Sequence, residues 1–365
     1  MAFGLPLFKN IKKDITAPSG KGSFLGVDIG SSTIKIVQIK NEKGLPTLET
    51  YGELQLGPYE GVEIGRNTHL QSARLTEALI DIIREATATS TTVAYALPYN
   101  SSFTNVVSIP TLDEEKITSM LPIEARKYIP VSLSKVALDW VLLGTNKQLV
   151  TTSVLLTATY TQVIEKYEEV IRGAGLTSQV HEIEVFSSLR SIVSPEDDVV
   201  ALLDFGGSST RLYIVEKGVV RKTHSVLLSG VDISNAFAQS LNIEFSHAEE
   251  VKRTHGISGI AGEAEAQKLI VQVLERGLRE LHTVLSRYEA DESLQIQKII
   301  LTGGASLLKG LDMYTRDMFS RNVEYAQPFD KVAYPAFLTD VLHEAGPSFA
   351  VAVGVALHAL QSAKN

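Results

Sequence analysis

The 365-residue chain contains no cysteine. This absence excludes disulfide bonds, thiolate catalysis and cysteine-ligated zinc, and it fits a reducing compartment. No apolar run reaches the length of about 18 residues that a membrane-spanning helix needs. The formal net charge of −8 argues against a nucleic-acid binder, which usually carries a basic face. With 44% hydrophobic residues, the chain has the composition of an ordinary globular protein of two or three domains.

Signals of the common hydrolases are also missing. The eight histidines are scattered, and no pair has the HExxH spacing of a zinc site. The serine-rich stretches lack the strained turn that exposes a serine nucleophile. The sequence therefore gives no indication of a metallohydrolase or a serine hydrolase.

Two segments of the chain are near-copies of each other. GVDIGSSTIKIVQI runs from Gly26 to Ile39, and LLDFGGSSTRLYIV runs from Leu202 to Val215. Each copy predicts an apolar strand, a tight turn of glycine and serine, and a second strand. The positions that correspond between the two copies are Asp28 and Asp204, Gly30 and Gly206, Ser32 and Ser208, and Lys35 and Arg211.

Such turns suit a phosphate group, because successive backbone N–H groups point into one concavity and glycine permits a close approach. The expected phosphate-binding residues are Gly30, Ser31, Ser32, Gly206, Gly207 and Ser208, with a further hydroxyl from Ser209. At the strand ends, Asp28 and Asp204 are expected to hold Mg²⁺, mainly through its waters. Lys35 and Arg211 on the return strands either contact the phosphates or are solvated strand charges.

A third glycine turn occurs in LTGGAS, where Gly303, Gly304 and Ala305 follow an apolar strand. We expect a helix after this turn, with Ser306 as its cap. A base or ribose can approach the backbone closely at such a helix N-terminus. Two facing turns with this third element predict a site for a polyphosphate attached to a nucleoside.

The organisation along the chain predicts two halves and an insertion. Residues 1–23 form a tail and linker, either a frayed end or a weak membrane-surface or partner-docking segment. Residues 101–180 predict a small α+β module, with a helix capped by Asp113 and kinked or split at Pro122. A second half begins at residue 199. The chain closes with an Ala/Gly-rich helix over 345–365, in which Gly354 permits close packing on another backbone.

These motifs and their order resemble the superfamily of actin, sugar kinases and heat-shock chaperone ATPases. The resemblance implies an α/β fold, the duplicated actin-like or ribonuclease H-like ATPase fold, with two halves around a nucleotide cleft and an inserted α+β subdomain. SHAEEVKR, from Ser246 to Arg253, is similar to the AExxK helix of bacterial actin-like members. That similarity implies that Glu249 and Lys252 lie beside the nucleoside.

The inserted module is similar to the 1C subdomain of the cell-division protein FtsA and of the PilM family of type IV pilus assembly. LPIEARKYIPVSLSKVALDWVLLG is close to the PilM pattern. The chain stops at Asn365, without the membrane-targeting helix of FtsA, which favours PilM. The expected subdomains are 1A over 24–100, 181–198 and 345–365, 1C over 101–180, and 2A/2B over 199–344.

The resemblance implies an ATP- and Mg²⁺-binding scaffold in the bacterial cytoplasm, peripheral on the inner membrane and involved in twitching motility. Its implied partner is the cytoplasmic N-terminal peptide of PilN, with other pilus inner-membrane components and the motor ATPase as further partners. Glu182 and Glu184 are candidates for orienting water in a slow ATPase reaction, and Glu184 matches the actin-like pattern better. The alternatives are an FtsA- or MreB-like cytoskeletal or division protein and a small-molecule kinase.

Overall fold

The computed structural model describes residues 22–194, 196–258 and 264–363. Two five-stranded sheets in this part of the chain have matching strand orders, β3-β2-β1-β4-β8 and β11-β10-β9-β12-β13. In each sheet the first three strands in chain order pair antiparallel, and the remaining two pair parallel. This repetition shows the duplicated actin-like fold that the near-copied turns predict, and the two sheets define a first and a second half.

The strands of the first half are β1 (Ser23–Ile29), β2 (Thr33–Glu42), β3 (Leu45–Gln55), β4 (Thr92–Leu97) and β8 (Thr177–Ile183). Those of the second half are β9 (Val199–Phe205), β10 (Thr210–Glu216), β11 (Val219–Val226), β12 (Lys298–Thr302) and β13 (Val323–Tyr325). Asp28 lies opposite Lys35 in the first hairpin, and Asp204 lies opposite Arg211 in the second. The aligned sequence pairs are therefore equivalent in the strand register as well.

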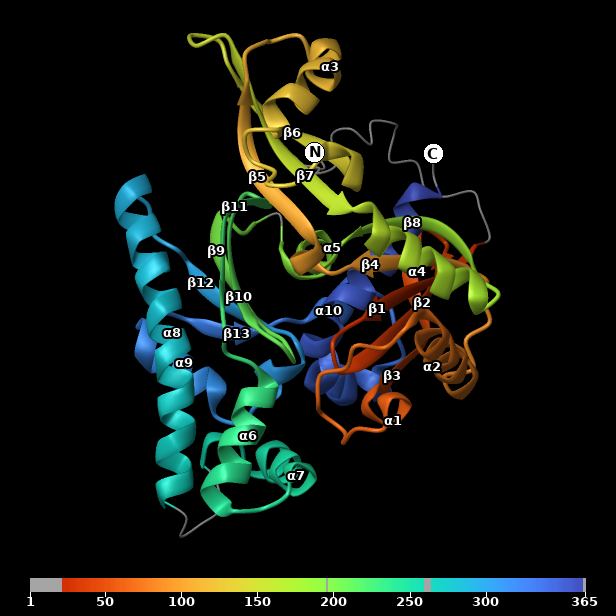
Figure 1. Cartoon of the computed structure of the whole chain (residues 1–365), viewed down its shortest axis with the longest axis vertical. Coiled ribbons are helices and arrows are strands. Elements are labelled where there is room, and N and C mark those ends of the chain that lie inside the picture. The colour runs from red at the N-terminus through yellow and green to blue at the C-terminus, as the bar shows by residue number, and fades with distance from the viewer. Residues whose placement is uncertain (1–21, 195, 259–263, 364–365) are drawn as a thin grey trace.

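Helices cover the two sheets from the outside and separate them in the middle (Figure 1). The first half carries α1 (Gly57–Glu60), α2 (Ser72–Glu85), α4 (Thr161–Gly173) and α5 (Glu184–Ile192). The second half carries α6 (Gly230–Leu241), α7 (Phe245–His255), α8 (Ala264–Glu292) and α9 (Leu311–Phe319). α10 (Thr339–Ser362) packs on β1, β2, β4 and α5. None of the described helices combines the length and the apolar character needed to cross a bilayer.

The close approach expected at Gly354 is present between α10 and α5. A Cβ added at Gly354 would lie 1.8 Å from the carbonyl oxygen of Ser187, so only glycine fits there. α10 begins at Thr339, earlier than the expected start at 345, and Pro347 lies inside it. The expected tail over 1–23 lies outside the described residues except for its last two, and β1 already begins at Ser23.

The inserted module contains β5 (Ser102–Ile109), α3 (Glu114–Ala125), β6 (Val136–Asn146) and β7 (Thr151–Tyr160). Its antiparallel sheet has the order β5-β7-β6 and shares a separate apolar core with α3. It projects from the rest of the molecule at the top of Figure 1. Asp113 caps α3 as expected, because its Oδ1 accepts the backbone N–H of Glu115 over 3.1 Å. α3 continues past Pro122, so the expected split is wrong.

The packing of α4 and β8 favours an insertion shorter than the expected range of 101–180. α4, expected as its last element, packs on α2, and its Tyr167, Val170 and Ile171 enter the core of the first half. β8 pairs with β4 of the first sheet. The amphipathic pattern of α4 predicts which face of the helix is buried. It does not predict against which sheet that face packs. We propose that the insertion covers 102–160.

Candidate functional site

A cleft of about 880 Å³ lies between the two halves. Apart from Glu182, the residues predicted for the site line this one cleft: Asp28, Gly30, Ser31, Ser32, Lys35, Glu184, Asp204, Gly206, Gly207, Ser208, Ser209, Arg211, Glu249, Lys252, Gly303, Gly304 and Ala305. These residues come from both near-copied turns, the third glycine turn, α5 and α7. The structure thus brings distant segments together, while the ligand role of each residue stays a prediction.

The two near-copied turns close in the same way and face each other. The N–H of Gly30 donates to the carbonyl oxygen of Thr33 over 2.9 Å, and the N–H of Gly206 donates to that of Ser209 over 3.0 Å. A Cβ added at Gly207 would lie 2.8 Å from the Oγ of Ser31. The turns therefore lie close together, and a side chain at position 207 would have to displace the Ser31 hydroxyl.

The third turn packs directly behind the second carboxylate. Gly303 has a φ of 86°, and a Cβ added there would lie 2.5 Å from the Oδ1 of Asp204. Both facts require glycine. Ser306 does not cap a helix as expected, because it lies in a short 3-10 helix, Gly304–Leu307, and its hydroxyl donates to the carbonyl oxygen of Gly303. The next helix, α9, begins only at Leu311, after Gly310.

The two cations on the return strands, Lys35 and Arg211, are buried, so their interpretation as solvated strand charges is wrong. Lys35 is 7% exposed and Arg211 is 8% exposed. The Nζ of Lys35 donates to the Oγ1 of Thr33 over 2.7 Å. The Nη1 of Arg211 donates to the Oε1 of Glu184 over 2.9 Å and lies 3.7 Å from the Oδ2 of Asp204.

The two aspartates are held in an environment that disfavours their charge. Burial raises the pKa of Asp28 from 3.8 to about 7, although Lys35 acts in the opposite direction. Burial also raises the pKa of Asp204 to about 6, against the effect of Arg211. Two half-buried carboxylates in one cleft are suited to a cation, since added positive charge would favour their ionised forms.

Of the two candidate glutamates, only Glu184 faces the cleft. Its Oε1 accepts the backbone N–H of Tyr99 over 3.0 Å in addition to Arg211. Glu182 lies in the interior, where it pairs with Arg190 and lies 3.2 Å from the Nδ1 of His358. Burial opposes ionisation of Glu182, but Arg190 and His358 lower its pKa to about 2. Glu182 is therefore a structural ion, as the preference for Glu184 implies.

On α7, Glu249 is buried and both of its oxygens accept hydrogen bonds. The Nζ of Lys252 donates to Oε2 over 2.6 Å, and the Nε of Arg253 donates to Oε1 over 2.7 Å. Lys252 also donates to the carbonyl oxygen of Gly230 over 3.0 Å. The pair thus joins α7 to the start of α6 at one end of the cleft.

Several polar atoms of the cleft fit a bound nucleotide. The buried Oγ of Ser209, Nε of Arg211 and Oδ1 of Asn67 have no hydrogen-bond partner among the described residues. Such orphaned polar groups fit a polar ligand. The described residues contain no group of three or more His, Asp or Glu side chains arranged to bind a metal directly. Asn67 was missed by the sequence reasoning, and its only signal there is a polar run before α2.

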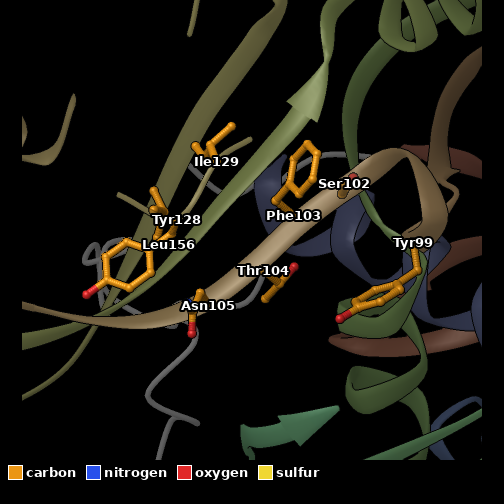
Figure 2. A pocket seen from close by; sticks show the side chains of 8 residues that line it. All are labelled: Tyr99, Ser102, Phe103, Thr104, Asn105, Tyr128, Ile129 and Leu156. Atoms are coloured by element: carbon orange, nitrogen blue, oxygen red, sulfur yellow. The ribbon is translucent and has the colours of Figure 1, made fainter. Parts of the chain in front are cut away.

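A smaller hollow of about 250 Å³ lies beside β5 on the inserted module. Its lining is Tyr99, Ser102, Phe103, Thr104, Asn105, Tyr128, Ile129 and Leu156. Figure 2 shows Tyr99 toward one end and Tyr128 toward the other, with β5 running between them. The Oγ1 of Thr104 is buried there without a partner among the described residues.

Solved structures that resemble this chain share the actin-like fold. A solved PilM–PilN type IV pilus biogenesis complex is 28% identical, with a TM-score of 0.79 and coverage of 93% of this chain and 99% of that one. MreB5 of Spiroplasma citri bound to AMPPNP is 13% identical, with a TM-score of 0.51 and coverage of 93% and 96%, which shows the actin-like fold alone.

Curated relatives include the cell division protein FtsA of Pseudomonas aeruginosa. It is 26% identical over 219 residues, which is 54% of this chain and 51% of that protein. The chain spans about half the length of the curated relatives that it matches. The family model described as type IV pilus assembly protein PilM matches residues 26–360. Because this match covers nearly the whole chain, the chain belongs to the PilM family of type IV pilus assembly proteins.

Proposed function

We propose that this PilM-family protein is an ATP- and Mg²⁺-binding scaffold that docks the cytoplasmic N-terminal peptide of PilN. One observation carries the nucleotide part: two equivalent glycine–serine turns, each preceded by a half-buried aspartate, face each other in one cleft beside the third glycine turn. The peptide part rests on the likeness to the solved PilM–PilN complex across 93% of the chain.

In this proposal the turns Gly30–Ser32 and Gly206–Ser208 cradle the phosphates from opposite sides. Asp28 and Asp204 hold Mg²⁺ through its waters, and the third turn with Glu249 and Lys252 borders the nucleoside. Bound Mg-ATP supplies a compact charge that both halves contact, and so it favours a closed cleft. Lys35 and Arg211 offset the negative charge of the phosphates from the return strands.

Glu184 is the proposed water-orienting residue of a slow ATPase reaction. Its Oε1 is held by the N–H of Tyr99 and by Arg211, which fixes the carboxylate at the edge of the cleft. An oxygen that already accepts two hydrogen bonds has little capacity left to accept a third from a water molecule. ATP turnover is therefore slow or absent in this proposal, which is compatible with a scaffold role.

The hollow beside β5 is the proposed docking place for the peptide. β5 is an edge strand of the module's sheet, so an extended segment can add to it through backbone hydrogen bonds. Phe103, Ile129 and Leu156 offer an apolar surface for one side chain of that segment, and Thr104 offers a buried hydroxyl. Docking would place the protein on the cytoplasmic face of the inner membrane. Other pilus components and the motor ATPase would lie nearby there, and the assembly would serve twitching motility.

The test is a titration with a fluorescent peptide that covers the cytoplasmic N-terminus of PilN, with and without Mg-ATP. We expect saturable binding that changes with nucleotide, and none with a scrambled peptide. Calorimetry of Mg-ATP binding tests the cleft separately. Absence of both interactions would reject the proposal, whereas filaments in electron micrographs with ATP would favour an FtsA- or MreB-like role.

A further inference from the structure

The loop Gly61–His69, between α1 and α2, runs along the cleft. We call these residues the cleft strap. The strap belongs to the first half, yet its contacts reach α7 of the second half. Gly65, Asn67, Thr68 and His69 of the strap line the cleft itself. The strap is therefore a connection between the two halves that the near-copied turns do not account for.

The outer anchor of the strap is the N-terminus of α7. The Oε1 of Glu63 accepts the backbone N–H of Ser246 over 3.1 Å. Glu244, the N-cap residue of α7, makes no side-chain cap hydrogen bond. A carboxylate at a helix N-terminus satisfies an otherwise unpaired N–H and opposes the positive end of the helix dipole. The cap of α7 is thus supplied by the opposite half of the molecule.

Arg66 strengthens this anchor. Its Nε donates to the Oε2 of Glu63 over 2.7 Å, and its guanidinium lies 3.9 Å from the centre of the Phe245 ring. The pair Glu63–Arg66 thus contacts the first two residues of α7 together. Gly65 between them has a φ of 92°, and a Cβ added there would lie 2.7 Å from the Cδ of Glu249. Only glycine lets the strap lie this close to α7.

The inner anchor is the first phosphate turn. Both the backbone N–H and the Oγ1 of Thr68 donate to the carbonyl oxygen of Ser31, over 2.8 and 3.0 Å. Between the two anchors, the Oδ1 of Asn67 is buried without a partner among the described residues. A Cβ added at Gly207 would lie 3.2 Å from this oxygen, so Asn67 faces the gap between the two turns.

We propose that the cleft strap is a clasp that retains the nucleoside triphosphate, and that Asn67 contacts its phosphates. This inference rests on the proposed nucleotide-binding function. An asparagine amide presents either its oxygen or its NH₂ group, so it can donate to a phosphate oxygen. The outer anchor links the first half to α7 of the second half beside the cleft, so we expect it to open when the nucleotide enters or leaves. The cleft strap therefore determines the rates at which the nucleotide binds and dissociates more than it determines the equilibrium affinity.

The first experiment measures these rates with a fluorescent ATP analogue and Mg²⁺ by stopped-flow mixing and chase. Glu63→Gln combined with Arg66→Ala should raise both association and dissociation rates by about fivefold or more, a change worth about 1 kcal/mol. The matched control is Glu77→Gln with Arg74→Ala, which removes an exposed ion pair of the same spacing on α2. Rates in the strap variant that equal those of the control would overturn the clasp.

The second experiment tests Asn67 by comparing ATP with adenosine. Asn67→Asp places a carboxylate beside the phosphates, so it should weaken ATP binding at least about tenfold and leave adenosine binding unchanged. Asn67→Ala should have a smaller effect of the same kind. Equal losses for both ligands would show a structural role and overturn the contact. A wild-type protein that binds no nucleotide would reject the proposed function and this inference together, whereas normal binding with unchanged rates rejects the inference alone.

Discussion

The backbone N–H of Tyr99 donates a hydrogen bond to the Oε1 of Glu184 over 3.0 Å. The ring of the same tyrosine lines the hollow beside β5, and its hydroxyl donates to the Oγ1 of Thr223 on β11 over 2.9 Å. One residue therefore touches the hollow, the carboxylate of the cleft and the second half. A rearrangement of the cleft on nucleotide binding would reach the hollow through Tyr99.

Replacing Tyr99 by alanine keeps the N–H group but removes the ring and the hydroxyl. We expect the affinity for the PilN peptide to lose its dependence on Mg-ATP, a coupling of about 1–3 kcal/mol in typical systems. Anisotropy titrations with and without nucleotide measure this difference. Tyr128→Ala, at the far end of the hollow, should weaken the peptide equally under both conditions. Coupling that survives in the Tyr99 variant would contradict the expectation.

Gly207→Val tests whether the two turns form one site. The added side chain would meet the Oγ atoms of Ser31 and Ser32, which lie 2.8 and 3.0 Å from a Cβ at this position. It would push the turns apart, so Mg-ATP binding should weaken by at least about 1–3 kcal/mol, the scale of a lost charged contact. Calorimetry measures the affinity, and circular dichroism checks the fold. Unchanged affinity would mean that the turns serve only the architecture.

Asp28→Asn gives a pH-dependent prediction for the protein without nucleotide and metal. Because burial raises the pKa of Asp28 from 3.8 to about 7, the folded protein holds this proton at pH values where the unfolded chain has lost it. The free energy of unfolding should therefore fall as pH rises from about 4 to about 7. The variant avoids this loss, so it should be more stable than the wild type at pH 8 by about 1–2 kcal/mol, after allowance for partial exposure.

Urea denaturation at pH 4 and pH 8 measures the effect. At pH 4 most of the difference should vanish, because the wild-type carboxyl is then protonated in the folded state. The same variant should lose the Mg²⁺ dependence of ATP binding. A wild-type protein that is the more stable one at pH 8 would show that Asp28 is stabilised by its surroundings instead.

Gly354→Ala should be the most damaging small substitution between α10 and α5. A Cβ there would lie 1.8 Å from the carbonyl oxygen of Ser187, and neither backbone can move without displacing its helix. We expect a loss of at least about 3 kcal/mol in the free energy of unfolding, measured in urea. Gly144→Ala is the control, since a Cβ at that position meets no atom within 4 Å. Similar stability of the two variants would contradict the packing argument.

Local sequence patterns were enough to predict the strands and turns that form the cleft. The copied turns identified both hairpins, and in the structure the aligned aspartates, Asp28 and Asp204, each lie opposite one of the aligned basic residues, Lys35 and Arg211. Each hairpin is a short-range structure whose turn chemistry decides it. Gly354 was also predictable, because an Ala/Gly-rich helix has few other reasons to hold a glycine.

Long-range packing was not readable in the same way. The apolar face of α4 fits any neighbouring sheet, so its membership of the first half could not be decided from the sequence. Lys35 is buried among segments that are distant in the chain, such as β3 with Glu53, and its own strand pattern does not contain this information. Asn67 lies in an irregular loop without periodicity, and its importance comes from Gly207, far away in the chain.

Two chain segments connect the inserted module to the first half, and each of them contacts a residue that lines the cleft. On the incoming side, Tyr99 is bonded to Glu184. On the outgoing side, the hydroxyl of Tyr167 on α4 donates to the carbonyl oxygen of Ile29, one residue before the first phosphate turn, over 3.3 Å. A pull on a peptide held by the module would therefore be borne at two points of the first-half wall of the cleft, so mechanical tension would alter how tightly the cleft holds its ligand.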